Sequence, residues 1–150
     1  MKELKQKVLN YYKQQVQDKE DAFRDMIAAL TEDASNDAKG SAGDKHETAL
    51  SMMHLEQEKL NQKLKEILGQ KAVLARIDSE SLFSKVALGS LVKANSMYLF
   101  VSAALPKIII DGVTILALSP ESPLGEKIMG REVGYSFEIN GTKYIVADIS

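Results

Sequence analysis

Two long stretches with apolar residues at helical spacing constrain the fold of this chain more than any other feature of its sequence. In residues 2–31, apolar residues recur at Leu4, Val8, Tyr12, Val16, Phe23, Ile27 and Leu30. In residues 47–76, they recur at Leu50, Met53, Leu60, Leu64 and Ile67, and Gln57 is the one polar member of that series. Steps of three and four residues place one narrow stripe along each helix, which is the pattern of a coiled coil. The sequence therefore predicts two long amphipathic helices.

The segment between these helices, residues 32–46, has the composition of a turn, with Asn36, Gly40, Ser41 and Gly43. Two helices of matched length, each ~45 Å long at 1.5 Å per residue, form an antiparallel hairpin when a short turn joins them. Since each stripe is narrow, the helices bury it mainly against each other. We therefore predict a helical hairpin over residues 1–77. We interpret Tyr11 and Tyr12 as packing in this hairpin, and Met52 and Met53 as lying in its seam or on its flank.

The second half of the chain has the patterns of β-structure. Residues 135–149 form two strand-like runs around Asn140-Gly141, and residues 107–118 do so around Asp111-Gly112, both of which suit tight hairpin turns. Further strands are predicted over residues 86–93 and 97–103. One short helix is predicted over residues 122–129, with Ser122 as its cap, Pro123 in its first position and Gly130 at its exit. The fold class is α+β, with the hairpin followed by a small antiparallel sheet and one helix over residues 78–150.

Composition excludes several classes of function. The chain has no cysteine, so disulfides and thiolate zinc sites are impossible. A net charge of −2 argues against stable direct binding of nucleic acid, which needs a basic surface. No apolar run approaches the ~20 residues of a membrane span, and the N-terminus has no signal-peptide core. We expect a cytoplasmic protein that is a monomer, with association through the hairpin as the alternative.

Two carboxylates at the entry to the second helix are the candidate functional residues. Asp44 and Glu47 are three positions apart and so share one side of the first helical turn. One interpretation is a plain helix cap, in which Glu47 completes a capping box. The other is that a partner protein receives both carboxylates and completes the shell of a Mg²⁺ ion, because two carboxylates alone hold Mg²⁺ weakly. No tightly bound cofactor is expected from the chain itself.

The segment Gly43-Asp44-x-x-Glu47-x-Ala49 resembles the tip motif of the bacterial Gre transcript-cleavage factors (the GreA/GreB-like family), Gly-Asp-x-x-Glu-Asn-Ala. Residues 86–92, Val-Ala-Leu-Gly-Ser-Leu-Val, are similar to the first strand of that family's C-terminal domain. Residues 122–131, Ser-Pro-Leu-Gly-Glu-Lys-Ile-Met-Gly-Arg, are similar to its Ser-Pro segment. The order and spacing of these segments agree with the family over nearly the whole chain.

The resemblance implies a transcription elongation factor that is not an enzyme by itself. Its C-terminal domain would be FKBP-like and would dock on the rim of the RNA polymerase secondary channel. The docking residues would be Ser122, Pro123, Leu124, Gly125 and Gly130. The hairpin would bring Asp44 and Glu47 to the polymerase active site, where they would help hold Mg²⁺ so that the polymerase cleaves backtracked RNA. The residues that would support the tip are Gly43, Lys45, His46, Thr48 and Ala49.

Departures from the family pattern keep two alternatives open. Thr48 replaces the Asn of the motif, and residues 32–43 lack the Arg-Glu pair that precedes Gly-Asp in the family. The first alternative is a secondary-channel regulator that does not stimulate cleavage, like DksA or the anti-Gre proteins. The tip also resembles the Asp-x-x-Asp-x-Ala of DksA, although this chain lacks the zinc cysteines of that family. The second alternative is a coiled-coil scaffold protein.

Overall fold

The structure, a computed structural model, describes the backbone of residues 1–40 and 44–150 and the side chains of residues 1–33 and 48–150. Contacts divide the chain into two units. The hairpin unit comprises Gln15–Lys71, and the sheet unit comprises Met1–Gln14 together with Ala72–Ser150. The sequence predicts two domains, residues 1–77 and 78–150, and this division stays a prediction.

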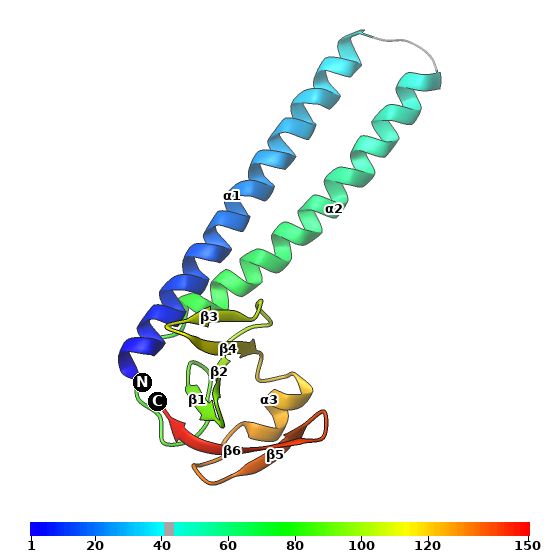
Figure 1. Ribbon diagram of the computed structural model, residues 1–150. Coiled ribbons are helices and arrows are strands. Elements are labelled where there is room, and N and C mark those ends of the chain that lie inside the picture. The colour runs from blue at the N-terminus through cyan, green and yellow to red at the C-terminus, as the bar shows by residue number, and fades with distance from the viewer. Residues whose placement is uncertain (41–43) are drawn as a thin grey trace. The chain divides into compact units, whose positions relative to one another are not determined.

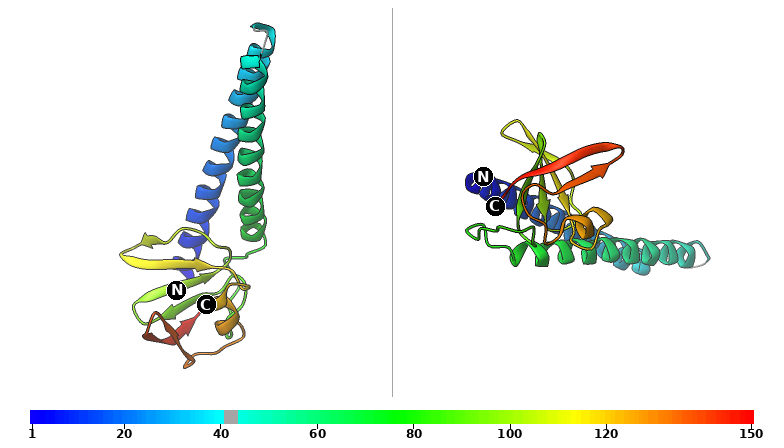
Figure 2. Two further views of the ribbon diagram at one scale, coloured as in Figure 1. Left: turned by 90° about the vertical axis from the view of Figure 1, so that its right-hand side faces the viewer. Right: turned by 90° about the horizontal axis from the view of Figure 1, so that it is seen from below.

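The hairpin unit is built from α1 (Lys2–Gly40) and α2 (Asp44–Ala75), which lie side by side and antiparallel (Figures 1 and 2). Both helices extend beyond the predicted bounds, so the expected ends at residues 31 and 47 were wrong. Residues 32–39 contain neither glycine nor proline but include Ala34 and Ala38, and alanine is the strongest helix former. The predicted seam is confirmed in the described part, where Val16, Leu60 and Ile67 are buried.

Polar side chains also link the two helices of the hairpin unit. The Lys71 ammonium lies 2.7 Å from one oxygen of Glu20, and the Arg24 guanidinium lies 2.8 Å from the other. Nearer the turn, the Gln57 amide donates a hydrogen bond to the Thr31 hydroxyl at 3.0 Å. The hydrogen bond from Lys71, and then that from Arg24, hold the pKa of Glu20 below its ordinary value.

The sheet unit contains a six-stranded sheet with the order β3-β4-β2-β1-β6-β5. Its elements are β1 (Leu91–Ala94), β2 (Met97–Val101), β3 (Ile108–Ile110), β4 (Val113–Leu118), α3 (Pro123–Ile128), β5 (Ser136–Ile139) and β6 (Thr142–Ile149). Both predicted hairpins are confirmed, since β3 pairs with β4 and β5 pairs with β6. The predicted small antiparallel sheet with one short helix is confirmed, and within this mostly antiparallel sheet one pair, β2 and β4, runs parallel. The strand predicted from residue 86 begins only at Leu91.

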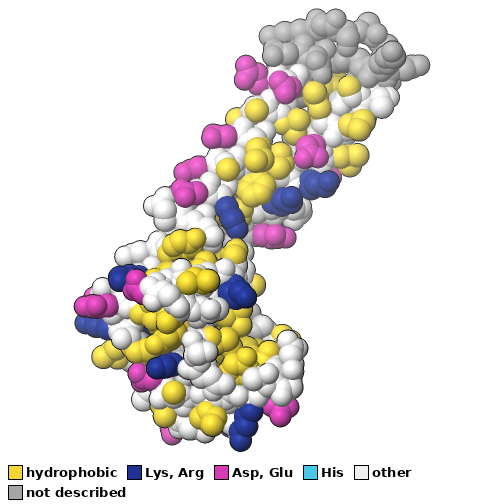
Figure 3. Space-filling view, in the orientation of Figure 1, with side chains coloured by type: hydrophobic (Ala, Val, Ile, Leu, Met, Phe, Trp, Pro, Cys, Tyr) yellow, Lys and Arg dark blue, Asp and Glu magenta, His cyan; other side chains and the backbone are white. Residues whose placement is uncertain are grey.

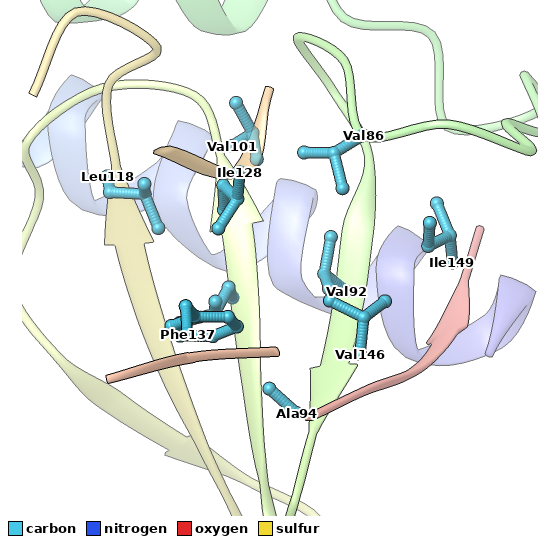
Figure 4. Packing of buried hydrophobic residues seen from close by; sticks show 10 residues of the cluster. Val86, Val92, Ala94, Val101, Leu118, Ile128, Phe137, Val146 and Ile149 are labelled. Carbon is cyan, nitrogen blue, oxygen red and sulfur yellow. The ribbon is translucent and has the colours of Figure 1, made fainter. Parts of the chain in front are cut away.

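Helix α3 contributes Ile128 to the buried cluster of the sheet unit (Figure 4). Ile128 of α3 is fully buried among residues that the strands supply: Val92, Ala94, Leu99, Val101, Leu118, Phe137, Val146 and Ile149. Aromatic rings extend this cluster, since Phe137 stacks between Tyr135 and Tyr144. The last two strands are therefore tied to the α3 face by side chains as well as by backbone pairing.

The start of α1 packs in the sheet unit. The Tyr12 ring is fully buried and stacks on Phe100 with their centroids 6.2 Å apart, and its hydroxyl donates to the Pro106 carbonyl at 2.6 Å. Burial raises the pKa of Tyr12 to about 12. The prediction that Tyr11 and Tyr12 pack within the hairpin was therefore wrong: Tyr12 packs on the sheet and Tyr11 is 47% exposed.

The first turns of α1 also fasten the segment that follows α2. Lys5 is buried, donates to the Ser81 carbonyl at 2.6 Å and lies over the Phe83 ring. Lys2 pairs with Glu80 at 2.7 Å. Residues 78–83 look like a linker by composition, yet side chains more than seventy positions earlier in the chain hold them in place.

We expect the Tyr12 contacts to contribute measurably to stability. Replacing Tyr12 with Phe removes one hydrogen bond and should cost about 1 kcal/mol. Replacing it with Ala also opens a cavity and should cost about 3–5 kcal/mol. Urea unfolding followed by circular dichroism measures both. The matched control is Tyr11→Ala at the neighbouring exposed position, which should change the free energy of unfolding by less than about 0.5 kcal/mol. Equal effects at both positions would contradict the packing described here.

The lowered pKa of Glu20 predicts a loss of stability in acid. Because the folded state favours the ionised carboxylate, its contribution is complete above the ordinary pKa of glutamate, about 4.3. It is lost as the pH falls through the lower folded value. The melting temperature of the native chain should therefore exceed that of Glu20→Gln at pH 7, and the difference should shrink toward pH 2. A difference that stays constant over this range would mean that the charge of Glu20 has no role.

Candidate functional site

The backbone places both predicted tip carboxylates on α2. Asp44 is the first residue of that helix, and Glu47 follows within the first turn. Lys45 and His46 lie on the same turn. The side chains of these four residues lie outside the described part of the chain, as does Gly43 entirely. The juxtaposition of the two carboxylates therefore stays a prediction.

The first described side chains of α2 are those of Thr48 and Ala49. Thr48 is exposed, whereas Ala49 is partly buried. Ala49 stands four residues before Met53, which is partly buried too, so it continues the seam of α2 toward the turn. The seam thus reaches Ala49, the last residue of the segment that resembles the tip motif.

Surface charge differs between the two helices of the hairpin unit. Acidic side chains are spaced along the α1 edge of the hairpin (Figure 3). Among the described side chains of α1 in the hairpin unit, the exposed acids are Asp18, Asp21, Asp25, Glu32 and Asp33. Basic residues outnumber acidic ones on α2 between residues 48 and 71. An acidic edge is repelled by the phosphates of nucleic acid and attracted by a basic protein surface.

The Ser-Pro segment of the sheet unit forms a tight helix start. The Ser122 hydroxyl oxygen accepts a hydrogen bond from the Gly125 amide at 3.0 Å and donates to the Ser119 carbonyl at 2.7 Å. Gly125 is buried, and a Cβ there would lie 2.1 Å from the Ser119 carbonyl oxygen. Gly130 leaves α3 with a φ of 76°, which favours glycine. These three predicted docking residues therefore have structural roles in the fold.

The structure brings together two of the segments that carry the family resemblance. The Gly130 amide donates to the Val86 carbonyl at 2.8 Å, and the Val86 amide donates to the Arg131 carbonyl at 2.9 Å. Residues 86–92 and 122–131 are therefore neighbours in space. Their joint occurrence in the sequence is explained by this contact and does not itself indicate a binding surface.

The sequence analysis did not name two features that follow α3 in the chain as candidate binding residues: the pair of Arg131 with Tyr135, and Val133. The Arg131 guanidinium lies 4.5 Å from the centre of the Tyr135 ring, and its Nε donates to the Lys127 carbonyl at 3.3 Å. Val133 nearby is 58% exposed. Of the predicted docking residues, Pro123 is exposed and Leu124 only partly so. Aromatic and arginine side chains are enriched where proteins bind one another, and this residue chemistry was the available signal.

No metal site is formed by the described side chains. Among residues 1–33 and 48–150, no three His, Asp or Glu side chains converge as metal ligands. In the same part of the chain, no helix is long and apolar enough to cross a membrane. The Mg²⁺ prediction concerns Asp44 and Glu47, which lie outside these residues.

Comparison with known proteins finds a likeness to a solved structure. No protein-family model matches the chain, and no curated protein matches it significantly in sequence. A solved structure described as the transcription factor Gfh1 aligns over 91% of this chain and 92% of its own, with 16% identity and a TM-score of 0.35. At this identity and TM-score we draw no function from the likeness.

The backbone of Ser119 and Pro120 approaches Gly125 closely, so a larger residue at Gly125 is predicted to destabilise the fold. Gly125→Ala forces a methyl group against backbone atoms and should destabilise the sheet unit by roughly 1–3 kcal/mol or more. Gly69 lies in α2 with open space around its missing Cβ, so Gly69→Ala should stabilise the chain by about 1 kcal/mol. Thermal unfolding compares the two variants. A Gly125→Ala protein as stable as the native chain would show that Gly125 is not required for packing.

Proposed function

We propose that this chain is a transcription factor that binds RNA polymerase and acts through its secondary channel. The observation that carries the proposal is the position of the Gly43-Asp44-x-x-Glu47-x-Ala49 motif. It stands where α2 begins, at the turn of a hairpin whose second helix, at 32 residues, is ~48 Å long. A rod of this length can carry its end deep into a partner.

The acidic edge of α1 supports a protein partner rather than a nucleic acid. Association with a basic protein channel would be accelerated by this charge, whereas association with RNA or DNA would be slowed. The sheet unit would supply the docking surface near α3. Pro123, Lys127 and Arg131 are its exposed members, while Ser122, Gly125 and Gly130 keep the helix in place.

In its finer form the proposal is that Asp44 and Glu47 stimulate cleavage of backtracked RNA by the polymerase. Two carboxylates fit part of the octahedral oxygen shell of Mg²⁺, and the polymerase would complete it. When bound, the ion activates a water and stabilises charge on the scissile phosphate. The part of this chain is to hold two oxygens in place, so it would be an activator and not an enzyme.

A non-cleaving regulator is the second candidate, because Thr48 is exposed where the cleavage motif has asparagine. In that case the hairpin would occupy the channel and modulate the polymerase without completing a metal site. The same binding surface serves both candidates, so only the reaction separates them.

The test is transcript cleavage by cognate RNA polymerase stalled in a backtracked complex with labelled RNA. The native chain should shorten the RNA from its 3′ end. The variant Asp44→Ala/Glu47→Ala should still bind but cleave about 10–100-fold more slowly, the effect expected when groups around a catalytic metal are removed. The matched control is Glu56→Ala/Glu58→Ala, which removes two exposed carboxylates of the same helix.

Each outcome has a distinct meaning. Cleavage that only the tip variant loses would establish the finer proposal. Binding without cleavage would leave the non-cleaving regulator. A native chain that does not bind the polymerase at all would refute both candidates.

A further inference from the structure

The seam of the hairpin unit contains a charged residue at a position that the pattern reserves for apolar ones. One series of buried or half-buried residues of α1 in the hairpin unit follows steps of four and three: Val16, Glu20, Phe23, Ile27 and Leu30. Glu20 occupies a core position in this series, and its side chain is only 9% exposed. A buried carboxylate is costly unless cations or hydrogen-bond donors satisfy both of its oxygens.

The partner of Glu20 stands in the equivalent series of α2. Leu60, Leu64 and Ile67 are followed by Lys71 at the same spacing. Lys71 satisfies one oxygen of Glu20 at 2.7 Å, and Arg24 satisfies the other at 2.8 Å from the same helix as Glu20. Among the described side chains, Lys71 is the only cation that reaches Glu20 from across the seam.

Within the hairpin unit, residues 15–71, apolar contacts alone do not select one register. A heptad repeat presents a similar apolar stripe after every slip of seven residues. One such slip brings Leu64 opposite Glu20, which leaves the carboxylate without its cross-seam cation. A slip in the other direction brings Asp78 opposite Glu20. Asp78 is a second carboxylate and lies beyond the end of α2. Either slip also separates Thr31 from Gln57, so polar contacts discriminate where apolar ones do not.

The register determines which residues form the end of the hairpin. In an antiparallel hairpin, a slip of seven residues between the helices moves the middle of the turn by about three to four residues along the chain. Such a shift would move the start of α2 away from Asp44. The contacts of Glu20 therefore bear on the residues that occupy the end of the hairpin, more than twenty positions later in the sequence.

We propose that Glu20 and Lys71 set the register of the hairpin and are positioning residues for the tip. The first part of this proposal, the role of the pair in the register, depends only on the seam geometry. The second part, the positioning of Asp44 and Glu47 for action on a polymerase, rests on the proposed function. Glu20 contacts no reacting group in this proposal and acts only through the alignment of the two helices.

Disulfide cross-linking tests the register directly, because the native chain has no cysteine. The reporter of the native register is Thr31→Cys/Gln57→Cys, which replaces two side chains in direct contact. The reporters of slipped registers are Thr31→Cys/Leu50→Cys and Thr31→Cys/Leu64→Cys, one heptad to either side. Each reporter is oxidised in the native background and in Glu20→Gln, and the cross-linked fraction is measured by mass spectrometry.

Glu20→Gln should raise the ratio of slipped to native cross-links by about tenfold, within the range of coupling across one contacting pair. Lys71→Gln should raise it too, whereas Lys71→Arg keeps the cation and should leave it unchanged. The matched control is Asp21→Asn, which removes an exposed carboxylate that accepts a hydrogen bond from Gln17 of its own helix. It should leave the ratio unchanged.

An unchanged ratio in Glu20→Gln with full helical circular dichroism would overturn the proposal, since the pair would then add stability without selecting a register. If Glu20→Gln loses its helicity, Lys71→Gln decides, because Glu20 keeps its contact with Arg24 in that variant. The cross-linking needs no polymerase. Failure of the native chain to act on polymerase would therefore refute the proposed function and leave the register result standing.

Discussion

The packing of the first turns of α1 against the sheet is the contact on which the core of the sheet unit depends. Val8 and Tyr12 are fully buried in the sheet unit, and Tyr12 reaches Phe100 and Pro106. The same helix then continues into the hairpin unit, where its seam pairs with α2. One helix therefore contributes to two cores. A seam as narrow as a coiled coil buries little surface by itself.

Local signals in the sequence were sufficient for most of the secondary structure. Asn140-Gly141 and Asp111-Gly112 both lie in tight turns with positive φ, and Ser122-Pro123 starts α3 as predicted. Local signals did not show the contacts between distant residues. The parallel pairing of β2 with β4 and the contact of Tyr12 with Phe100 join segments that share no local pattern. Helical periodicity showed that Tyr12 would be buried but not which surface would bury it.

The two parts of the family resemblance differ in what they support. In residues 122–131, Ser122 caps a helix, Gly125 allows a close backbone approach and Gly130 adopts a positive φ. A chain with this fold needs such residues whatever it binds, so their presence supports the fold. Asp44 and Glu47 are different, because a helix start can be capped without two acids at this spacing. The proposed function therefore depends on Asp44 and Glu47.

The seam shows how a charge at a core position can matter for residues far away. The sequence pattern displayed the anomaly, since the apolar series of α1 skips from Val16 to Phe23 and leaves Glu20 between them. Its partner could not be read from the sequence, because any lysine of α2 might have been opposite. With Lys71 and Arg24 in place, both oxygens of the carboxylate are paired in one register, whereas a slip of seven residues keeps Arg24 but takes Lys71 away from Glu20. A rod that delivers residues at its end needs such a constraint, because apolar repeats hold two helices together without fixing where they turn.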